Sequence, residues 1–277
     1  MPQPDLFSEG SHESPSHLVG TRVLIAAIAL LVLGGGFLYF KGQSLITPTD
    51  PHSLCPSKQS PGEVVAILLD PSDALGEPQR VQLRGVLQRV SNQLPRFGLI
   101  EVYRIGTVAS VLPKPVIHLC NPGSGHDVSR FYSNPDLANR KWQMFADSVM
   151  STIEREISAQ QQATSPIFEA VQAIGVRTFR QPTFDGRPKH LVIVSDLLQN
   201  VPGGIDMYKP LPPFNAFKET PYYQQIRTNL SDVHVFLVYL NRPLVRTQGR
   251  RHVDFWEEYF KDQRAQVDSV NQLFGDR

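Results

Sequence analysis

Two aspartates, Asp70 and Asp196, each come directly after a run of apolar residues. The runs 64–69 (VVAILL) and 190–195 (HLVIVS) are rich in β-branched types and are typical of strands buried on both faces of a sheet. In open α/β sheets, ligands bind beyond the carboxyl ends of the strands. If the two strands are neighbours, their carboxylates lie side by side above the sheet. There they could help to hold a divalent cation, or Asp70 could be the nucleophile of a metal-dependent hydrolase.

Hydroxyl groups near these aspartates could complete a cation site. Ser72 lies two residues after Asp70, and Thr164 and Ser165 precede a predicted helix. Each residue also has an ordinary structural use, because Asp and Ser bond to nearby backbone in turns and a Ser before Pro166 can cap a helix. Their joint occurrence in this order favours a cation site over separate turns and caps.

The elements that must position these residues alternate between strands and helices. Strands are expected at 63–69, 99–105, 116–120, 190–195 and 233–240, and helices at 77–94, 136–161, 166–174, 222–230 and 252–274. The gap between the second and third strands is too short for a helical crossover, so that pair is expected to be antiparallel. The order predicts an α/β fold with a doubly wound, mostly parallel sheet and one antiparallel edge strand.

The N-terminal part of the chain differs in composition from the rest. Residues 1–22 are polar and rich in Ser and Pro, which is typical of a disordered tail. Residues 23–40 (VLIAAIALLVLGGGFLYF) carry no charge and would reach about 27 Å as a helix, close to the ~30 Å hydrocarbon core of a bilayer. We interpret them as a single-pass transmembrane helix; a buried core helix and a secretory signal are the alternatives. Residues 41–62 form a Pro-rich linker, and the folded domain is expected at 63–277.

Charge and cysteine content narrow the function classes. The formal net charge of +1 over 277 residues gives no sign of a nucleic-acid-binding surface. Arg22 before the apolar segment and Lys41 and Lys58 after it do not decide the membrane orientation. The two cysteines, Cys55 and Cys120, are either a disulfide pair in an oxidising compartment or two unrelated thiols.

This arrangement resembles a von Willebrand factor A-type (integrin I-like) domain over roughly residues 63–275. That family carries Asp-x-Ser-x-Ser after its first strand, a Thr or Ser before a helix, and an Asp after its fourth strand. Residues 70–74 (DPSDA), 164–167 (TSPI) and 192–196 (VIVSD) take these places here. The similarity includes the antiparallel third strand and implies a metal-ion-dependent adhesion site above the sheet.

The resemblance implies Mg²⁺ or Mn²⁺ as the ion. Ser72 and either Thr164 or Ser165 would bind it directly, while Asp70 and Asp196 would accept hydrogen bonds from metal-bound waters. Neutral hydroxyl ligands leave the charge of the ion incompletely balanced, so that it attracts an acidic group of a partner.

One position departs from the family pattern. Ala74 stands where the family has its second serine, and a methyl group cannot bind a metal. Asp73 is a candidate substitute ligand, but its charge would weaken the attraction of the ion for an anionic partner.

The same topology bears on the cysteines. Cys55 precedes the first strand and Cys120 ends an antiparallel third strand, so both would lie at the end of the sheet opposite the acidic loops. This favours a disulfide and places the domain outside the cytoplasm, in the periplasm of a bacterium. It also holds the acidic loops away from the membrane.

We therefore expect a membrane-anchored binding module that recruits a protein partner rather than an enzyme. The loop 200–221 would add aromatic contacts from Tyr208, Phe214, Phe217 and Tyr222. The alternatives are a metal-free structural scaffold of a membrane complex and, with less support, a hydrolase. The hydrolase is disfavoured because the Asp70 loop lacks the Asp-x-Asp spacing usual in such enzymes.

Overall fold

The computed structural model describes residues 15–44, 47–72, 75–106, 114–128, 134–158, 163–242 and 244–275, with the backbone alone at 15–22 and 41–44. The chain divides into two compact units, Met1–Thr47 and Pro48–Arg277.

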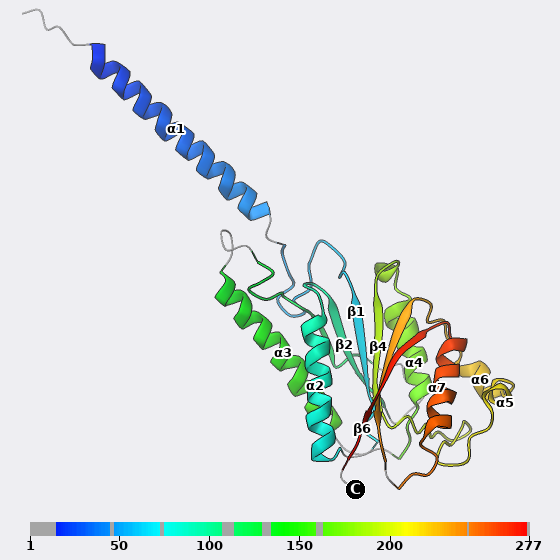
Figure 1. The fold of residues 1–277 in the computed structure, drawn as a ribbon. Coiled ribbons are helices and arrows are strands. Elements are labelled where there is room, and N and C mark those ends of the chain that lie inside the picture. The colour runs from blue at the N-terminus through cyan, green and yellow to red at the C-terminus, as the bar shows by residue number, and fades with distance from the viewer. Residues whose placement is uncertain are drawn as a thin grey trace, which may run out of the picture. The chain divides into compact units, whose positions relative to one another are not determined.

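The described part of the first unit is one helix, α1 (Pro15–Ser44) (Figure 1). Its stretch Val23–Phe40 carries apolar side chains around its whole circumference, and none of them is buried. By length and composition this stretch can cross a membrane, and a signal sequence has the same properties.

The second unit is built on a six-stranded sheet in the order β3-β2-β1-β4-β5-β6. The strands are β1 (Val64–Leu69), β2 (Leu99–Arg104), β3 (Ile117–Cys120), β4 (Lys189–Ser195), β5 (Val233–Leu240) and β6 (Gln266–Leu273). All neighbouring pairs are parallel except β2 and β3. The mostly parallel sheet with one antiparallel edge strand is therefore confirmed, and β1 lies directly beside β4.

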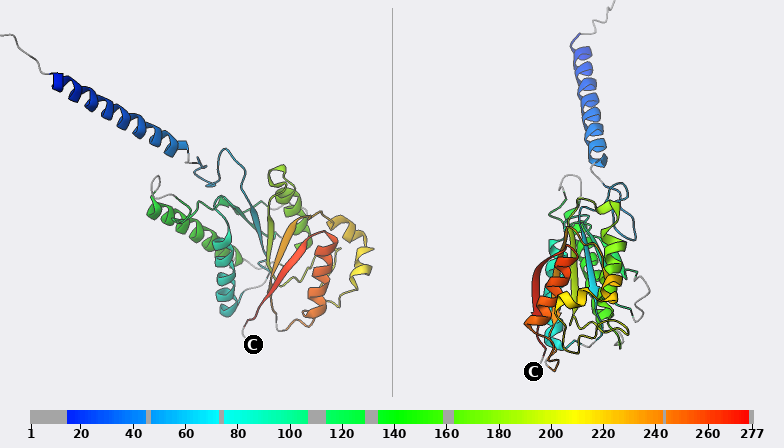
Figure 2. Two further views of the ribbon diagram at one scale, coloured as in Figure 1. Left: turned by 45° about the horizontal axis from the view of Figure 1, so that its top comes forward. Right: turned by 90° about the vertical axis from the view of Figure 1, so that its right-hand side faces the viewer.

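Helices cover both faces of this sheet (Figure 2). One layer holds α2 (Glu77–Gln93) and α3 (Pro135–Ile157); the other holds α4 (Ile167–Ile174), α5 (Phe214–Lys218), α6 (Pro221–Ile226) and α7 (Arg250–Asp262). Successive side chains of a strand point to opposite faces, so alternate residues of β1 enter different cores. Val64, Ala66 and Leu68 pack with the α4 layer, while Val65, Ile67 and Leu69 pack with α2 and α3. This two-sided burial explains the unbroken apolar run in β1.

The predicted helix at 252–274 is wrong in its second half. Helix α7 ends at Asp262, Arg264 adopts a left-handed conformation (φ 68°), and the chain continues as the edge strand β6. The sequence 266–273 (QVDSVNQL) is mostly polar because only one neighbour, β5, covers this edge. A polar edge strand carries little of the β-branched signal on which strand prediction depends.

Residues 48–62, expected as a flexible spacer, pack against the second unit. Cys55 and Cys120 form a disulfide with a Cα–Cα distance of 4.8 Å. The backbone N–H of Cys120 donates to the carbonyl of Ser53 at 2.8 Å, which adds a direct contact beside the disulfide. Cys120 pairs with Leu99 at the start of β2, so this junction lies at the amino end of the parallel strands. The compact unit consequently begins at Pro48 rather than at Glu63.

Candidate functional site at the carboxyl end of the sheet

The structure brings Asp70 and Asp196 to the same end of the sheet. Leu69 of β1 is in register with Val194 of β4, and the N–H of Asp70 donates to the carbonyl of Val194 at 3.0 Å. Both carboxylates are nearly inaccessible to solvent, with 3% of Asp70 and 1% of Asp196 exposed. Neighbouring parallel strands thus place two buried carboxylates at the crevice where α/β folds bind ligands.

The carboxylate of Asp70 is held by three donors. Its Oδ2 accepts hydrogen bonds from Ser165 Oγ at 2.8 Å and from Ser195 Oγ at 2.7 Å. Its Oδ1 accepts from the backbone N–H of Ser72 at 3.0 Å. Hydrogen bonds to an ionised acceptor are stronger than neutral ones, so these bonds fix the 70–72 turn to the end of β4 and to the segment before α4.

The carboxylate of Asp196 is paired with a cation supplied by the chain itself. Arg242, which follows β5, places its Nε 3.3 Å from Asp196 Oδ2, and only 15% of the arginine side chain is exposed. The other carboxylate oxygen accepts from the N–H of Leu198 at 3.0 Å. Gln248 Nε2 donates to the backbone carbonyl of Asp196, also at 3.0 Å. The loop after β5 is therefore fastened to the end of β4.

The backbone turn after Asp196 is a constrained one. Leu197 has a left-handed conformation (φ 60°), which is costly for a residue with a Cβ. Its N–H donates to Ser195 Oγ at 2.8 Å. Its carbonyl accepts from Trp256 Nε1 at 3.0 Å and pairs with His252 Nε2 at 3.1 Å. Bonds from both sides stabilise this turn, which orients the neighbouring carboxylate.

His252 is completely buried, and its two hydrogen-bond partners, the Tyr239 hydroxyl and the Leu197 carbonyl, are uncharged. Its Nδ1 lies 2.7 Å from the hydroxyl of Tyr239. Because the carbonyl of Leu197 can only accept, Nε2 of His252 carries the proton in that pair and Nδ1 accepts from Tyr239. Burial lowers the pKa of His252 to about 4, so the ring is neutral at pH 7.

Ser165 does not cap helix α4. No side-chain hydrogen bond caps that helix from its N-cap residue Pro166. The Oε1 of Gln199 instead accepts from the N–H of Ile167 at 2.5 Å and of Phe168 at 3.0 Å. The Ser165 hydroxyl thus has no capping role and donates to Asp70 instead.

The other predicted site positions are Thr164, Asp73 and Ala74. Thr164 is half-buried beside Ser165. Asp73 and Ala74 lie outside the described residues. Sequence reasoning missed Ser195, Arg242 and Gln199, and the one available signal was their location directly at or after the carboxyl ends of β4 and β5.

Three of the four predicted loop aromatics do not form a surface. Phe214 and Phe217 are buried among the helices of the α4 layer. Tyr222 is partly buried, and its hydroxyl donates to Glu169 Oε1 at 2.8 Å. Tyr208 is 46% exposed. The loop is polar and Pro-rich in sequence, yet its phenylalanines serve as core because short helices turn them inward.

A divalent cation fits the described residues poorly. Mg²⁺ requires near-octahedral oxygen coordination and usually keeps several waters, which needs oxygen atoms that face open space, including acceptors for those waters. Here Arg242 already supplies the positive charge beside Asp196, and both oxygens of Asp70 accept from protein donors. Within the described ranges, no cluster of three or more His, Cys, Asp or Glu side chains is arranged to hold a metal. We therefore assign no role to a metal ion at this site.

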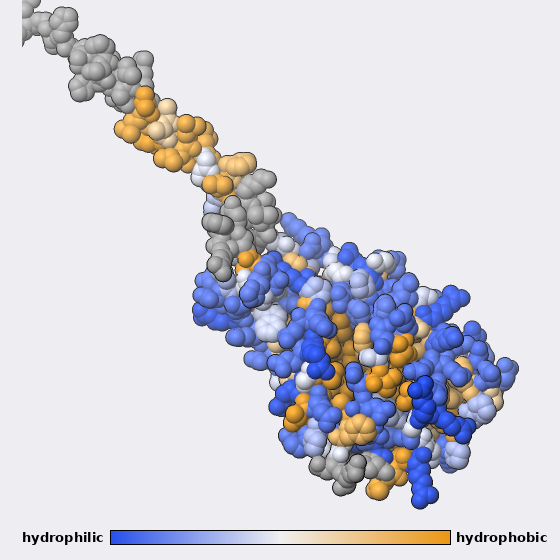
Figure 3. Space-filling view, in the orientation of Figure 1, coloured by the Kyte–Doolittle hydropathy of each residue, from blue (hydrophilic) through white to orange (hydrophobic). Residues whose placement is uncertain are grey.

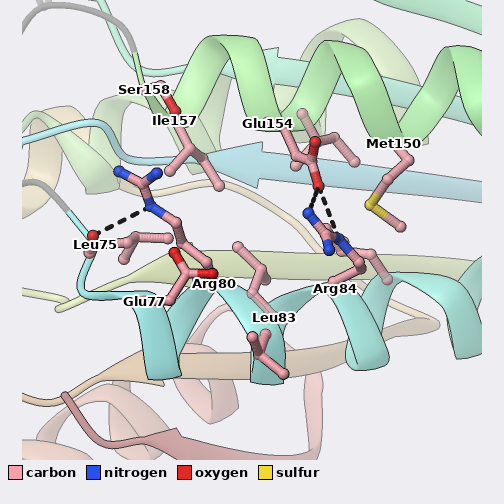
Figure 4. A pocket seen from close by; sticks show the side chains of 12 residues that line it. Leu75, Glu77, Arg80, Leu83, Arg84, Met150, Glu154, Ile157 and Ser158 are labelled. Atoms are coloured by element: carbon pink, nitrogen blue, oxygen red, sulfur yellow. Dashed lines mark hydrogen bonds and ion pairs between the residues drawn. The ribbon is translucent and has the colours of Figure 1, made fainter. Parts of the chain in front are cut away.

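A separate hollow of about 180 Å³ lies between α2 and α3 (Figure 4). The Arg84–Glu154 ion pair crosses it, with nitrogen and oxygen 2.6 Å apart, and Arg80 Nε donates to the carbonyl of Leu75 at 3.2 Å. Its described lining residues include neither Asp70 nor Asp196. This hollow is distinct from the polar cluster at the end of the sheet.

The sheet order and the antiparallel β3 give the chain a von Willebrand factor A-like fold. No protein-family model and no curated protein sequence matches the chain.

Solved structures that are similar to the chain include three with low sequence identity. BatB from Bacteroides thetaiotaomicron, a conserved hypothetical protein, is 15% identical, with 76% of this chain and 91% of that chain covered and a TM-score of 0.36. An aerotolerance-related membrane protein from Bacteroides fragilis, with multiple mutations to serines, is 12% identical, with coverage of 76% and 92% and a TM-score of 0.37. The VWA domain of SpRpn10 is 10% identical, with coverage of 76% and 86% and a TM-score of 0.34.

Proposed function

We propose that this protein is a membrane-anchored binding module that recruits a protein partner through the carboxyl end of its sheet. The loops 70–72, 196–213 and 241–249 make up this end, here called the rim. The observation that carries the proposal is the buried cluster around Asp70 and Asp196, which ties these loops to one another and to the start of α4. A surface held in one conformation before binding loses less entropy when a partner docks.

The rim and the segment beside it present apolar side chains to solvent. Tyr208 is 46% exposed, Leu244 96% and Phe274 58%. Side chains of this kind are the usual anchors of protein interfaces, because they bury large apolar areas on docking. The buried side chains of Phe214 and Phe217 are not required for such an interface.

Anchoring outside the cytoplasm is part of the proposal. The apolar stretch of α1 supports a single-pass anchor, and the Cys55–Cys120 disulfide supports an oxidising compartment such as the periplasm. The chain enters the domain at Pro48, close to the disulfide and at the amino end of the strands. Within the domain the rim is at the other end of the strands from this entry point.

Partner capture in this proposal does not pass through Mg²⁺ or Mn²⁺, since Arg242 supplies the charge beside Asp196. A metal titration followed by thermal unfolding examines this. Because a ligand that binds only the folded state raises the melting temperature, a rise at millimolar metal that Asp196→Asn abolishes would contradict it.

Site-specific photo-crosslinking in cells tests the recruitment itself. A crosslinking amino acid replaces Tyr208 or Leu244 on the rim, and Arg140 or Arg180 as controls. Both control residues are exposed; the N–H of Gly125 bonds to Asn139, which places Arg140 near the amino end of the strands. We expect a discrete crosslinked protein from the two rim positions and none from the controls. The same crosslinked protein from all four positions, or no crosslinked protein from the rim positions, would refute the proposal.

A further inference from the structure

Around Arg242, the loop after β5 and the start of α7 contain further basic residues that the site described above does not use. Arg242, Arg246, Arg250 and Arg251 fall within the loop and the first residues of α7, and no acidic residue lies between Asn241 and His252. In a chain whose formal net charge is +1, this is a local concentration of positive charge.

Hydrogen bonds hold the loop after β5 against the end of the sheet. Gln248 Nε2 donates to the carbonyls of Leu240 and Asp196, both at 3.0 Å, and its Oε1 accepts from the N–H of Arg242 at 2.6 Å. The Arg242 side chain is directed inward to Asp196. One glutamine and one arginine thus close the loop on the end of the sheet.

Several described side chains of this segment face solvent, whereas Val245 packs against the core and Thr247 is half-buried. Leu244 is 96% exposed, and Arg246 and Arg251 are both exposed. Arg250 is engaged by Asp254, with Nε and Oδ1 2.7 Å apart. Neither Arg246 nor Arg251 forms an ion pair with any residue that the structure describes. Two exposed guanidinium groups and one exposed apolar side chain thus lie on the loop and the first turn of α7.

We propose that this loop, through Arg246, Arg251 and Leu244, binds an acidic segment of the protein partner without a metal ion. The inference rests on the proposed function and names the chemistry of its partner. The planar guanidinium group of arginine can donate two parallel hydrogen bonds to one carboxylate, a bidentate arrangement. Electrostatic complementarity of this kind determines which partner docks and how fast.

The surroundings favour a peptide over a larger polyanion. Glu77, Asp206 and Asp254 lie on neighbouring segments of the same end of the domain, where Asp206 pairs with Lys209 and Asp254 pairs with Arg250. A membrane or a nucleic acid presents charge over a wide area and would meet these carboxylates as well. A single acidic segment can contact the loop alone. Figure 3 shows hydrophobic side chains among strongly hydrophilic ones near the C-terminal end of the domain, as such mixed recognition requires.

The test uses the full chain in nanodiscs of zwitterionic lipid and a fluorescent oligoglutamate peptide as the probe. Binding is followed by anisotropy with and without EDTA, at low and high salt, and with oligoglutamine as the neutral control. The test variant is Arg246→Gln with Arg251→Gln. The charge-matched control is Arg140→Gln with Arg180→Gln, at two exposed arginines outside the rim.

We expect peptide binding that EDTA leaves unchanged and that salt weakens. The rim variant should bind at least about fivefold more weakly, whereas the control variant should bind as the parent does. Loss of binding in EDTA, equal weakening in both variants, or stronger displacement of the peptide by duplex DNA or phosphatidylglycerol vesicles than by unlabelled peptide would overturn the inference. Crosslinks from Leu244 without peptide binding would refute the charge assignment alone, whereas absence of rim crosslinks would refute the proposed function.

Discussion

The buried His252 makes stability depend on pH in a defined window. Its pKa falls from 6.5 to about 4 on folding, because burial disfavours the charged ring. A folded state that resists protonation has its full stability above the unfolded pKa and loses it as the pH falls towards the folded pKa. For these two values the free energy of unfolding should drop by about 2 kcal/mol between pH 6.5 and pH 4.5.

The pH range in which His252 changes the stability differs from the ranges of His118 and Glu101. A hydrogen bond to Glu101 raises the pKa of His118, so its contribution is lost only as the pH rises above 6.5. Burial, the largest influence on Glu101, raises its pKa. Hydrogen bonds from His118, Thr178 and Tyr103 outweigh it and lower the pKa below 4.5, so its contribution is lost only at lower pH.

Urea unfolding at a series of pH values between these limits measures the effect. His252→Gln keeps a donor for the carbonyl of Leu197 but cannot titrate, so its unfolding free energy should be lower at neutral pH and nearly constant across the window. His126→Gln, at an exposed position, is the matched control and should keep the slope of the parent chain. The reasoning fails if the parent chain shows no slope, or if the slope survives in His252→Gln.

Further predictions concern the disulfide and the rim. The Cys55–Cys120 bond spans 65 residues, so replacing both cysteines with serine should cost about 4 kcal/mol and lower the melting temperature by about 10 °C in calorimetry. Arg242→Met leaves the buried carboxylate of Asp196 without its cation and should cost about 3 kcal/mol in urea unfolding; adding Asp196→Asn should restore a large part. Ser195→Ala removes one of two hydroxyl donors to the carboxylate at the end of β1 and should cost about 2 kcal/mol by the same assay, with an unchanged far-UV spectrum.

The fold could be predicted because its signals are local. The run 64–69 has the unbroken apolar pattern of a strand buried on both faces, and the helix now seen at Pro135–Ile157 has a clear amphipathic stripe. The short connection before β3 was enough to predict an antiparallel edge. The strand β6 was not predicted because its sequence is mostly polar. It pairs with β5 alone, and no local sequence pattern encodes such pairing.

The site was predicted only in part, for a physical reason. Asp70, Ser165 and Asp196 were found because each lies where a strand ends or a helix begins, which sequence spacing reveals. Arg242 and Gln248 were missed because their roles depend on a loop that closes over the end of another strand. Contacts between loops distant in sequence leave no periodic pattern.

Arg242 changes what the acidic pair can do. A divalent ion bound directly by neutral hydroxyl groups would attract an anion, and that attraction would vanish with a chelator. A guanidinium beside Asp196 instead forms an ion pair within the protein and holds the loop in place. Attraction for an acidic partner must then come from arginines that remain exposed, such as Arg246 and Arg251. The buried pair fixes the loop, and the exposed residues of the same loop determine what it binds.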